Sequence, residues 1–95
     1  MLKITFQEDA KGQTIQLEGK VVGPWVEELR RAWHTLPPSL GSRKLQLDLR
    51  GVTFVDTKGR HLLQEIHRRT NASFMADSPL TQYFADDAMQ QSLKN

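Results

Sequence analysis

The stretch Asp56-Thr57-Lys58-Gly59 brings together an acid, a hydroxyl, a base and a glycine, directly after an apolar run and before a helical pattern. A threonine at a helix start lies beside the unpaired N–H groups of the first turn and the positive end of the helix dipole. A phosphate on the Thr57 hydroxyl would be tolerated there and would add a charge of about −1.5 to −2. Thr57 is therefore a candidate phosphorylation site, and the alternative is that Asp56 and Thr57 are ordinary N-cap residues.

The sequence contains no recognisable catalytic or metal-binding motif. His61 and His67 point roughly 120° apart on a helix, so they cannot form a helical metal-binding pair. Asp48 and Asp56 would be the only conceivable acid–base pair, and no nucleophile or set of metal ligands accompanies them. The sequence has no P-loop, no dinucleotide-binding glycine motif and no cysteine. We therefore expect a protein that is not an enzyme and that uses no cofactor and no metal.

Hydrophobic periodicity predicts the elements that lead up to the candidate turn. Apolar and polar residues alternate over residues 2–7 and again over residues 14–18, with a glycine-containing loop between them, which is typical of a β-hairpin. Pro24 is a typical first residue of a helix, and Pro37-Pro38 would end that helix. The predicted apolar stripe of this helix comprises Trp25, Leu29, Ala32, Trp33 and Leu36.

The second half of the chain alternates strand and helix. Residues 44–55 have the apolar content of a central strand, and after Asp56-Thr57 the pattern predicts a helix whose inward residues are Leu62, Leu63, Ile66 and Thr70. A short strand over residues 73–76 precedes a third helix from Pro79, with an inward stripe of Leu80, Tyr83, Phe84 and Ala88. We predict one α/β domain spanning residues 1–95, with a mixed four-stranded sheet and about three helices packed on one face.

Residues 47–59, with the sequence LDLRGVTFVDTKG, and the following Leu62-Leu63 resemble the signature of the STAS domain, the family of anti-sigma-factor antagonists. The stretch Leu17-Glu18-Gly19-Lys20 is similar to the family's exit from its second strand, and the order of predicted elements also matches. The resemblance covers the chain from about Ile4 to about Phe84. It implies a compact version of the STAS fold.

The resemblance also implies a function. In that family a partner kinase phosphorylates the Ser or Thr directly after the Asp, and the unphosphorylated form binds the partner. By motif position this residue is Thr57, and the partner would be an anti-sigma factor with a serine-kinase fold, so catalysis would belong to the partner. The residues that we expect to dock this partner are Asp56, Thr57, Lys58, Gly59, Arg60, His61 and Gln64.

Two departures from the family pattern keep other partners open. Lys58 and Arg60 make the predicted docking surface more basic than is usual in the family, which puts the kinase contact in doubt. Some members instead serve transporters as small subunits without phosphorylation, so a transporter component is an alternative partner. The chain also ends soon after the third helix, so a remaining sheet edge could pair with another chain, including a second copy in a homodimer.

Charge and composition bear on nucleic-acid and membrane roles. The formal net charge is +2 and acids and bases are interspersed, so nucleic-acid binding is an alternative that we do not favour. Arg60 and Arg68 would flank the buried stripe of the second helix rather than form one basic ridge.

No apolar stretch approaches the length of a membrane span, and the absence of cysteine is compatible with a reducing compartment. We expect a cytoplasmic protein.

Overall fold

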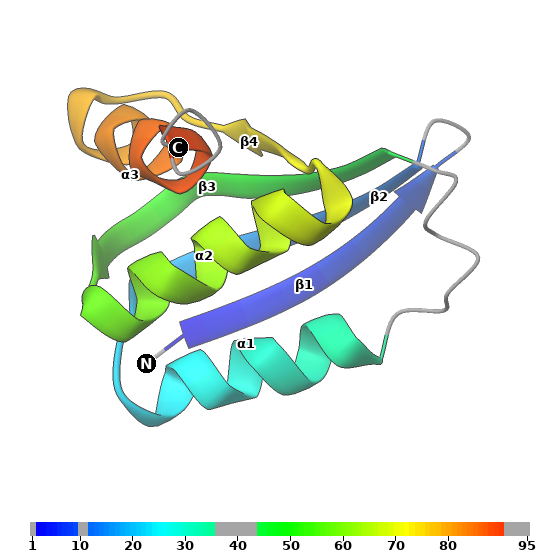
Figure 1. Ribbon diagram of the computed structural model, residues 1–95, viewed down its shortest axis with the longest axis horizontal. Helices are drawn as coiled ribbons and strands as arrows, with labels where there is room; N and C mark the ends of the chain where they lie inside the picture. Colours follow the sequence, from blue (N-terminus) through cyan, green and yellow to red (C-terminus); the bar gives the residue numbers. More distant parts are fainter. Residues whose placement is uncertain (1, 10–11, 36–43, 91–95) are drawn as a thin grey trace.

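The computed structural model describes residues 2–9, 12–35 and 44–90 of the chain (Figure 1). Strands and helices follow one another in the predicted order. They are β1 (Leu2–Asp9), β2 (Gly12–Val21), α1 (Pro24–His34), β3 (Lys44–Val55), α2 (Thr57–Thr70), β4 (Ser73–Met75) and α3 (Pro79–Gln90). The predicted helix end at Pro37-Pro38 and the apolar position Leu36 lie outside the described residues.

The sheet is mixed and has four strands in the order β1-β2-β3-β4. β1 and β2 form an antiparallel hairpin, whereas β3 pairs in parallel with both β2 and β4. Parallel neighbours need a crossover, and here α1 connects β2 to β3 while α2 connects β3 to β4. The predicted fold class is therefore confirmed. This topology places the start of α2 directly after the end of β3, next to the end of β2.

The strands alternate between an apolar face and a polar face, so the core forms on one side of the sheet. Ile15 and Leu17 on β2 and Leu47 and Leu49 on β3 are fully buried, whereas Gln16 on β2 is only half-buried. Figure 1 shows α2 lying across the sheet and α1 running alongside β1, and α3 contacts α2. Leu29 on α1 and Leu62, Leu63 and Ile66 on α2 complete the core.

Two helical stripes differ from the prediction. On α1, Val26 is buried and Trp25 is only half-buried, although the predicted stripe included Trp25 and omitted Val26. On α2, Thr70 is exposed rather than inward, because its hydroxyl donates a hydrogen bond of 2.6 Å to the Ile66 carbonyl oxygen at the helix end. Such a bond satisfies the hydroxyl locally, so the residue needs no place in the core.

The third helix turns a different face inward from the predicted one. Leu80 and Tyr83 are 47% and 55% exposed. The buried residues of α3 are Thr81, Phe84, Ala85 and Ala88. These follow the i, i+3, i+4, i+7 spacing of a helix face, and the two alanines let α3 lie close to its neighbours. The prediction was right for Phe84 and Ala88 and wrong for Leu80 and Tyr83.

Candidate functional site

The turn between β3 and α2 is held in shape by Asp56. Its Oδ1 accepts a hydrogen bond of 2.7 Å from the Gly59 N–H, which is the N-cap contact of α2. Its Oδ2 accepts a second hydrogen bond of 2.9 Å from the Gly23 N–H, in the turn between β2 and α1. Asp56 therefore ties two turns together that are 33 residues apart in the sequence. The predicted capping role of Asp56 is confirmed.

These contacts affect the ionisation of the carboxyl group. The hydrogen bond from Gly23, assisted by that from Gly59 and by the charge of Lys58, lowers the pKa of Asp56 below its ordinary value, although burial acts in the opposite direction. Asp56 is thus ionised at neutral pH, with both carboxylate oxygens engaged inside the turn. Asp56 belongs to the predicted docking residues, and in the structure its carboxylate stabilises the turn.

Gly59 is buried because the first turn of α2 approaches the end of β2 very closely. A Cβ atom at this position would lie 2.6 Å from the Val21 carbonyl oxygen and 2.8 Å from a methyl group of Val55. The backbone oxygen cannot move aside as a flexible side chain could, so only glycine fits. Gly59 therefore determines how closely α2 packs against the sheet, and it is itself buried.

Gly23 on the facing turn is required for a different reason. Its φ of 52° and ψ of −129° lie in a region that residues with a Cβ rarely adopt. No atom lies within 4 Å of the place where its Cβ would be. Here the backbone conformation, rather than the available space, favours glycine, and that conformation aims the Gly23 N–H at Asp56.

The Thr57 side chain is exposed at the first position of α2, and Lys58 and His61 are exposed beside it. The Asp56 cap holds the backbone at the base of the Thr57 side chain, and this side chain is exposed to solvent. No acidic residue lies in the first turn of α2. Within this turn, the Asp56 carboxylate is therefore the negative charge that faces the positive end of the helix dipole.

Arg60 and Gln64 are partly exposed, and both contact α3. The Arg60 guanidinium donates two hydrogen bonds, of 3.0 and 2.9 Å, to the two carboxylate oxygens of Asp87. The Gln64 side-chain amide donates to the same carboxylate at 3.3 Å and to the Asp87 carbonyl oxygen at 3.4 Å. The arginine contact lowers the pKa of Asp87. We expected both residues on the outer face of α2; instead they join α2 to α3.

Two residues that the sequence analysis assigned to the core extend the exposed surface near this contact. Tyr83 lies one helical turn before Asp87 and close to Arg60. Leu80 lies about one turn before Tyr83, near the start of α3. Large exposed apolar side chains are typical of protein interfaces, and tyrosine is enriched there. A second stripe with helical spacing, formed by Thr81, Phe84, Ala85 and Ala88, was also present in the sequence. Choosing it as the buried face would have predicted that Leu80 and Tyr83 are exposed.

Most basic side chains outside the turn have acidic neighbours. Arg30 contacts Glu27 and Glu65, and Arg69 contacts the same Glu65. Further pairs are Lys3 with Glu18, Arg31 with Glu28, and Asp48 with Arg50. These pairs place acidic and basic side chains next to each other on the described surface.

The other residues considered for chemistry are engaged separately. Asp48 accepts hydrogen bonds from the Arg50 side chain, which lower its pKa, so Asp48 and Asp56 belong to different contacts. His67 is half-buried, with its Nδ1 3.0 Å from the Ala72 carbonyl oxygen, whereas His61 is exposed. Phe54, near the end of β3, is 51% exposed. No cluster of three or more potential metal ligands occurs in the described part of the chain.

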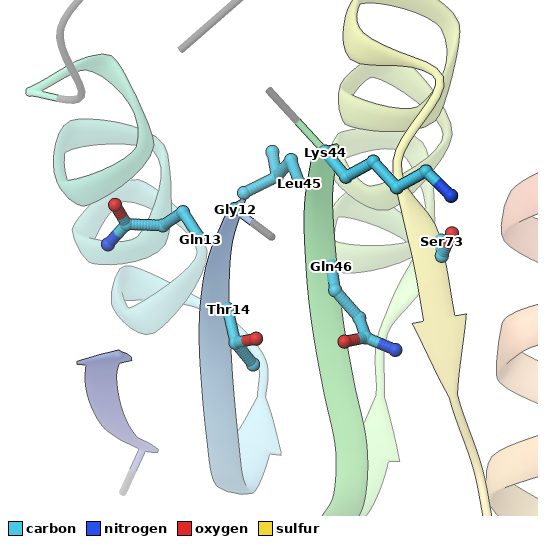
Figure 2. Close-up of a pocket in the computed structure, with 7 residues that line it drawn as sticks. All are labelled: Gly12, Gln13, Thr14, Lys44, Leu45, Gln46 and Ser73. Carbon is cyan, nitrogen blue, oxygen red and sulfur yellow. The ribbon is translucent and has the colours of Figure 1, made fainter. Parts of the chain in front are cut away.

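A hollow of about 200 Å³ lies at the opposite end of β3 from Thr57 (Figure 2). Thr14, Gln46 and Ser73 are neighbours across β2, β3 and β4 in the sheet register, and Lys44 lies at its edge. Because Lys44 begins β3 and Thr57 follows its end, the whole strand separates the hollow from the candidate turn. It is not part of the candidate phosphorylation site. Among the described helices, none combines the length and apolar character that crossing a membrane requires.

Solved structures with the same fold identify the architecture. An anti-sigma factor antagonist from Mycobacterium paratuberculosis matches with a TM-score of 0.73 at 17% identity, over 87% of this chain and 74% of that one. The unphosphorylated anti-sigma factor antagonist SpoIIAA matches with a TM-score of 0.63 at 17% identity, over 85% of this chain and 79% of that one. A third structure, of Mglu, matches with a TM-score of 0.64 at 22% identity, over 79% of this chain but only 19% of its own length.

Sequence comparison adds no closer relative. No protein-family model matches the sequence, and a search of curated proteins found no significant match. The structural matches establish that the chain has the STAS fold, as the signature at residues 47–59 predicts.

Proposed function

We propose that this chain, which has the fold of anti-sigma factor antagonists, is a regulatory module that binds a partner protein through the β3–α2 turn and is switched by phosphorylation of Thr57. The observation that carries the proposal is the exposed Thr57 side chain on a turn that Asp56 caps and in which Gly59 packs closely against the end of β2. The partner that the proposal names is an anti-sigma factor with serine-kinase activity, which would supply the catalysis.

The docking surface in this proposal consists of the exposed side chains around the turn. They are Thr57, Lys58 and His61 on α2, together with Leu80 and Tyr83 on α3. Tyr83 and Leu80 supply apolar area, and Lys58 supplies a positive charge beside the hydroxyl. Asp56, Gly59, Arg60 and Gln64 act from beneath: they hold the turn and the α2–α3 pair in the geometry that the partner meets.

A phosphate on Thr57 would act at this surface without unfolding the domain. Its charge of about −1.5 to −2 lies next to the N-terminus of α2, where the helix dipole favours an anion. The same charge and bulk would stand in the contact area and oppose docking of a surface that fits the free hydroxyl. Phosphorylation would therefore release the partner while the fold is kept.

The experiment is affinity capture from the native host with tagged variants, quantified by mass spectrometry. Wild type and Thr57→Ala should retain the partner, and Thr57→Glu should lose it. Thr70→Glu is the matched control, because it places the same charge on an exposed threonine at the other end of α2. Equal capture by Thr57→Glu and wild type would refute the switch, and capture of a transporter component by all variants would favour the alternative partner.

A further inference from the structure

The free edge of the sheet is formed by β1, which pairs with β2 and with no other described strand. Its pairing with β2 runs from Leu2 to Asp9 without a register shift, and the strand contains no proline. Proteins normally shield such an edge with a bulge, a proline or a covering segment, because its backbone groups offer a template for another strand. β1 carries neither of the first two devices, and its charged side chains, Lys3, Glu8 and Asp9, lie towards its two ends.

The apolar side chains of β1 are incompletely covered by α1. Leu2 is buried, Ile4 is half-buried and Phe6 is 41% exposed, and all three lie on the face of the sheet that carries the helices. A groove of about 400 Å³ separates them from Glu28, Arg31, Ala32 and Thr35 on and after α1. The groove has an apolar floor and a charged rim.

We propose that a second copy of this chain occupies this edge, with the two β1 strands paired antiparallel about a two-fold axis at Thr5. Residues directly opposite each other in an antiparallel pair lie on the same face of the sheet. An axis at Thr5 places Ile4 opposite Phe6 of the second copy, and the symmetry repeats this contact. The two partly exposed apolar side chains of each copy then cover each other, and the sheet continues across the dimer.

The rim of the groove favours a second copy over a different occupant. Glu28 and Arg31 carry opposite charges on neighbouring positions of α1, and their side chains are 54% and 75% exposed. Their mutual contact of 3.7 Å is a surface pair that contributes little by itself. A two-fold axis runs the two α1 helices antiparallel, and the proposal places Glu28 of each copy towards Arg31 of the other. The rim is thus complementary to itself, which is the requirement for a symmetric interface.

This interface is independent of the proposed switch. β1 lies at one edge of the sheet, whereas Thr57 follows β3, which is separated from β1 by β2. The dimer proposal can therefore fail while the Thr57 proposal stands, and the reverse also holds.

The first test is sedimentation equilibrium of the purified chain and two lysine variants. Wild type should be a dimer, and Phe6→Lys should weaken the dimer by more than about tenfold because a lysine at the edge opposes strand pairing. Phe54→Lys is the matched control, since Phe54 is exposed to a similar extent but lies on β3. A monomeric wild type, or equal behaviour of the two variants, would overturn the proposal. Circular dichroism checks that both variants are folded.

The second test fixes the register by oxidation of single-cysteine variants, which is clean because the natural chain has no cysteine. Thr5→Cys should form a covalent dimer, because the two Thr5 positions face each other across the axis at a Cβ separation of about 4.5 to 5.5 Å, near that of a disulfide. Gln16→Cys should not, although Gln16 is the direct neighbour of Thr5 on β2. Cross-linking of both variants at the same rate, or of neither, would contradict the β1 interface.

Discussion

Replacement of Asp56 by alanine should destabilise the domain by about 2 kcal/mol. Loss of an N-cap side chain costs about 1 kcal/mol, and loss of a hydrogen bond between a carboxylate and a backbone N–H costs about another 1 kcal/mol. Asp56 makes one contact of each kind, to Gly59 and to Gly23. For a chain of this size, a loss of 2 kcal/mol corresponds to a decrease in melting temperature of roughly 10 °C.

The assay is equilibrium unfolding in urea, followed by circular dichroism, for three variants. Asp56→Asn should lose less than Asp56→Ala, because one amide oxygen can still accept one of the two hydrogen bonds. Asp86→Ala is the control: Asp86 is exposed on α3 and accepts only the Gln82 side chain at 2.9 Å. We expect its free energy of unfolding to stay within about 0.5 kcal/mol of wild type.

The pH dependence gives the same prediction a second check. Because the pKa of Asp56 is lowered on folding, its stabilisation is present above the unfolded value of about 3.9 and is lost as the pH falls through the folded value. The difference between wild type and Asp56→Ala should therefore be full at pH 7 and shrink below about pH 4. An Asp56→Ala protein as stable as wild type at pH 7, or a difference that does not change with pH, would refute the reasoning.

Three further predictions follow from neighbouring contacts. Gly59→Ala should cost about 1 to 3 kcal/mol in urea unfolding, because its Cβ would meet the Val21 carbonyl oxygen at 2.6 Å; an unchanged midpoint would contradict the close approach. Asp87→Ala should cost about 1 kcal/mol, since Arg60 is partly solvated and the ion pair is screened; the loss should be smaller at high salt, and a salt-independent loss would argue against the pair. Finally, wild-type stability should fall on acidification below about pH 4, because the pKa values of Asp48, Asp56 and Asp87 are all lowered on folding; a flat profile from pH 7 to pH 3 would contradict this.

Local patterns predicted the elements and the cap, because both depend on residues that are close in sequence. The alternation of strands, the proline at the start of α1 and the Asp56 cap all fall in this class. The contact between Gly23 and Asp56 spans 33 residues, and that between Arg60 and Asp87 spans 27. No periodicity within one element specifies such pairs, so the structure was needed to show that Arg60 pairs with Asp87 on α3.

The errors in α3 and β3 have specific physical causes. Phe84 and Ala88 fit both the predicted stripe of α3 and the observed one, and the choice between Leu80 with Tyr83 and Thr81 with Ala85 depends on how closely α2 approaches. In β3, the register against β2 shifts twice near its end, so strict alternation no longer predicts the face on which Phe54 lies. Leu80 and Tyr83, which the sequence pattern placed in the core, belong to the proposed docking surface, whereas Phe54 does not.

The most direct test of the switch is the phosphorylation state of Thr57 in two pools of the native protein, one free and one bound to its partner, measured by mass spectrometry after cross-linking in host cells. The proposal predicts phosphorylated Thr57 in the free pool and its near absence in the bound pool. Equal phosphorylation of Thr57 in both pools, or no phosphate on Thr57 in either, would contradict it.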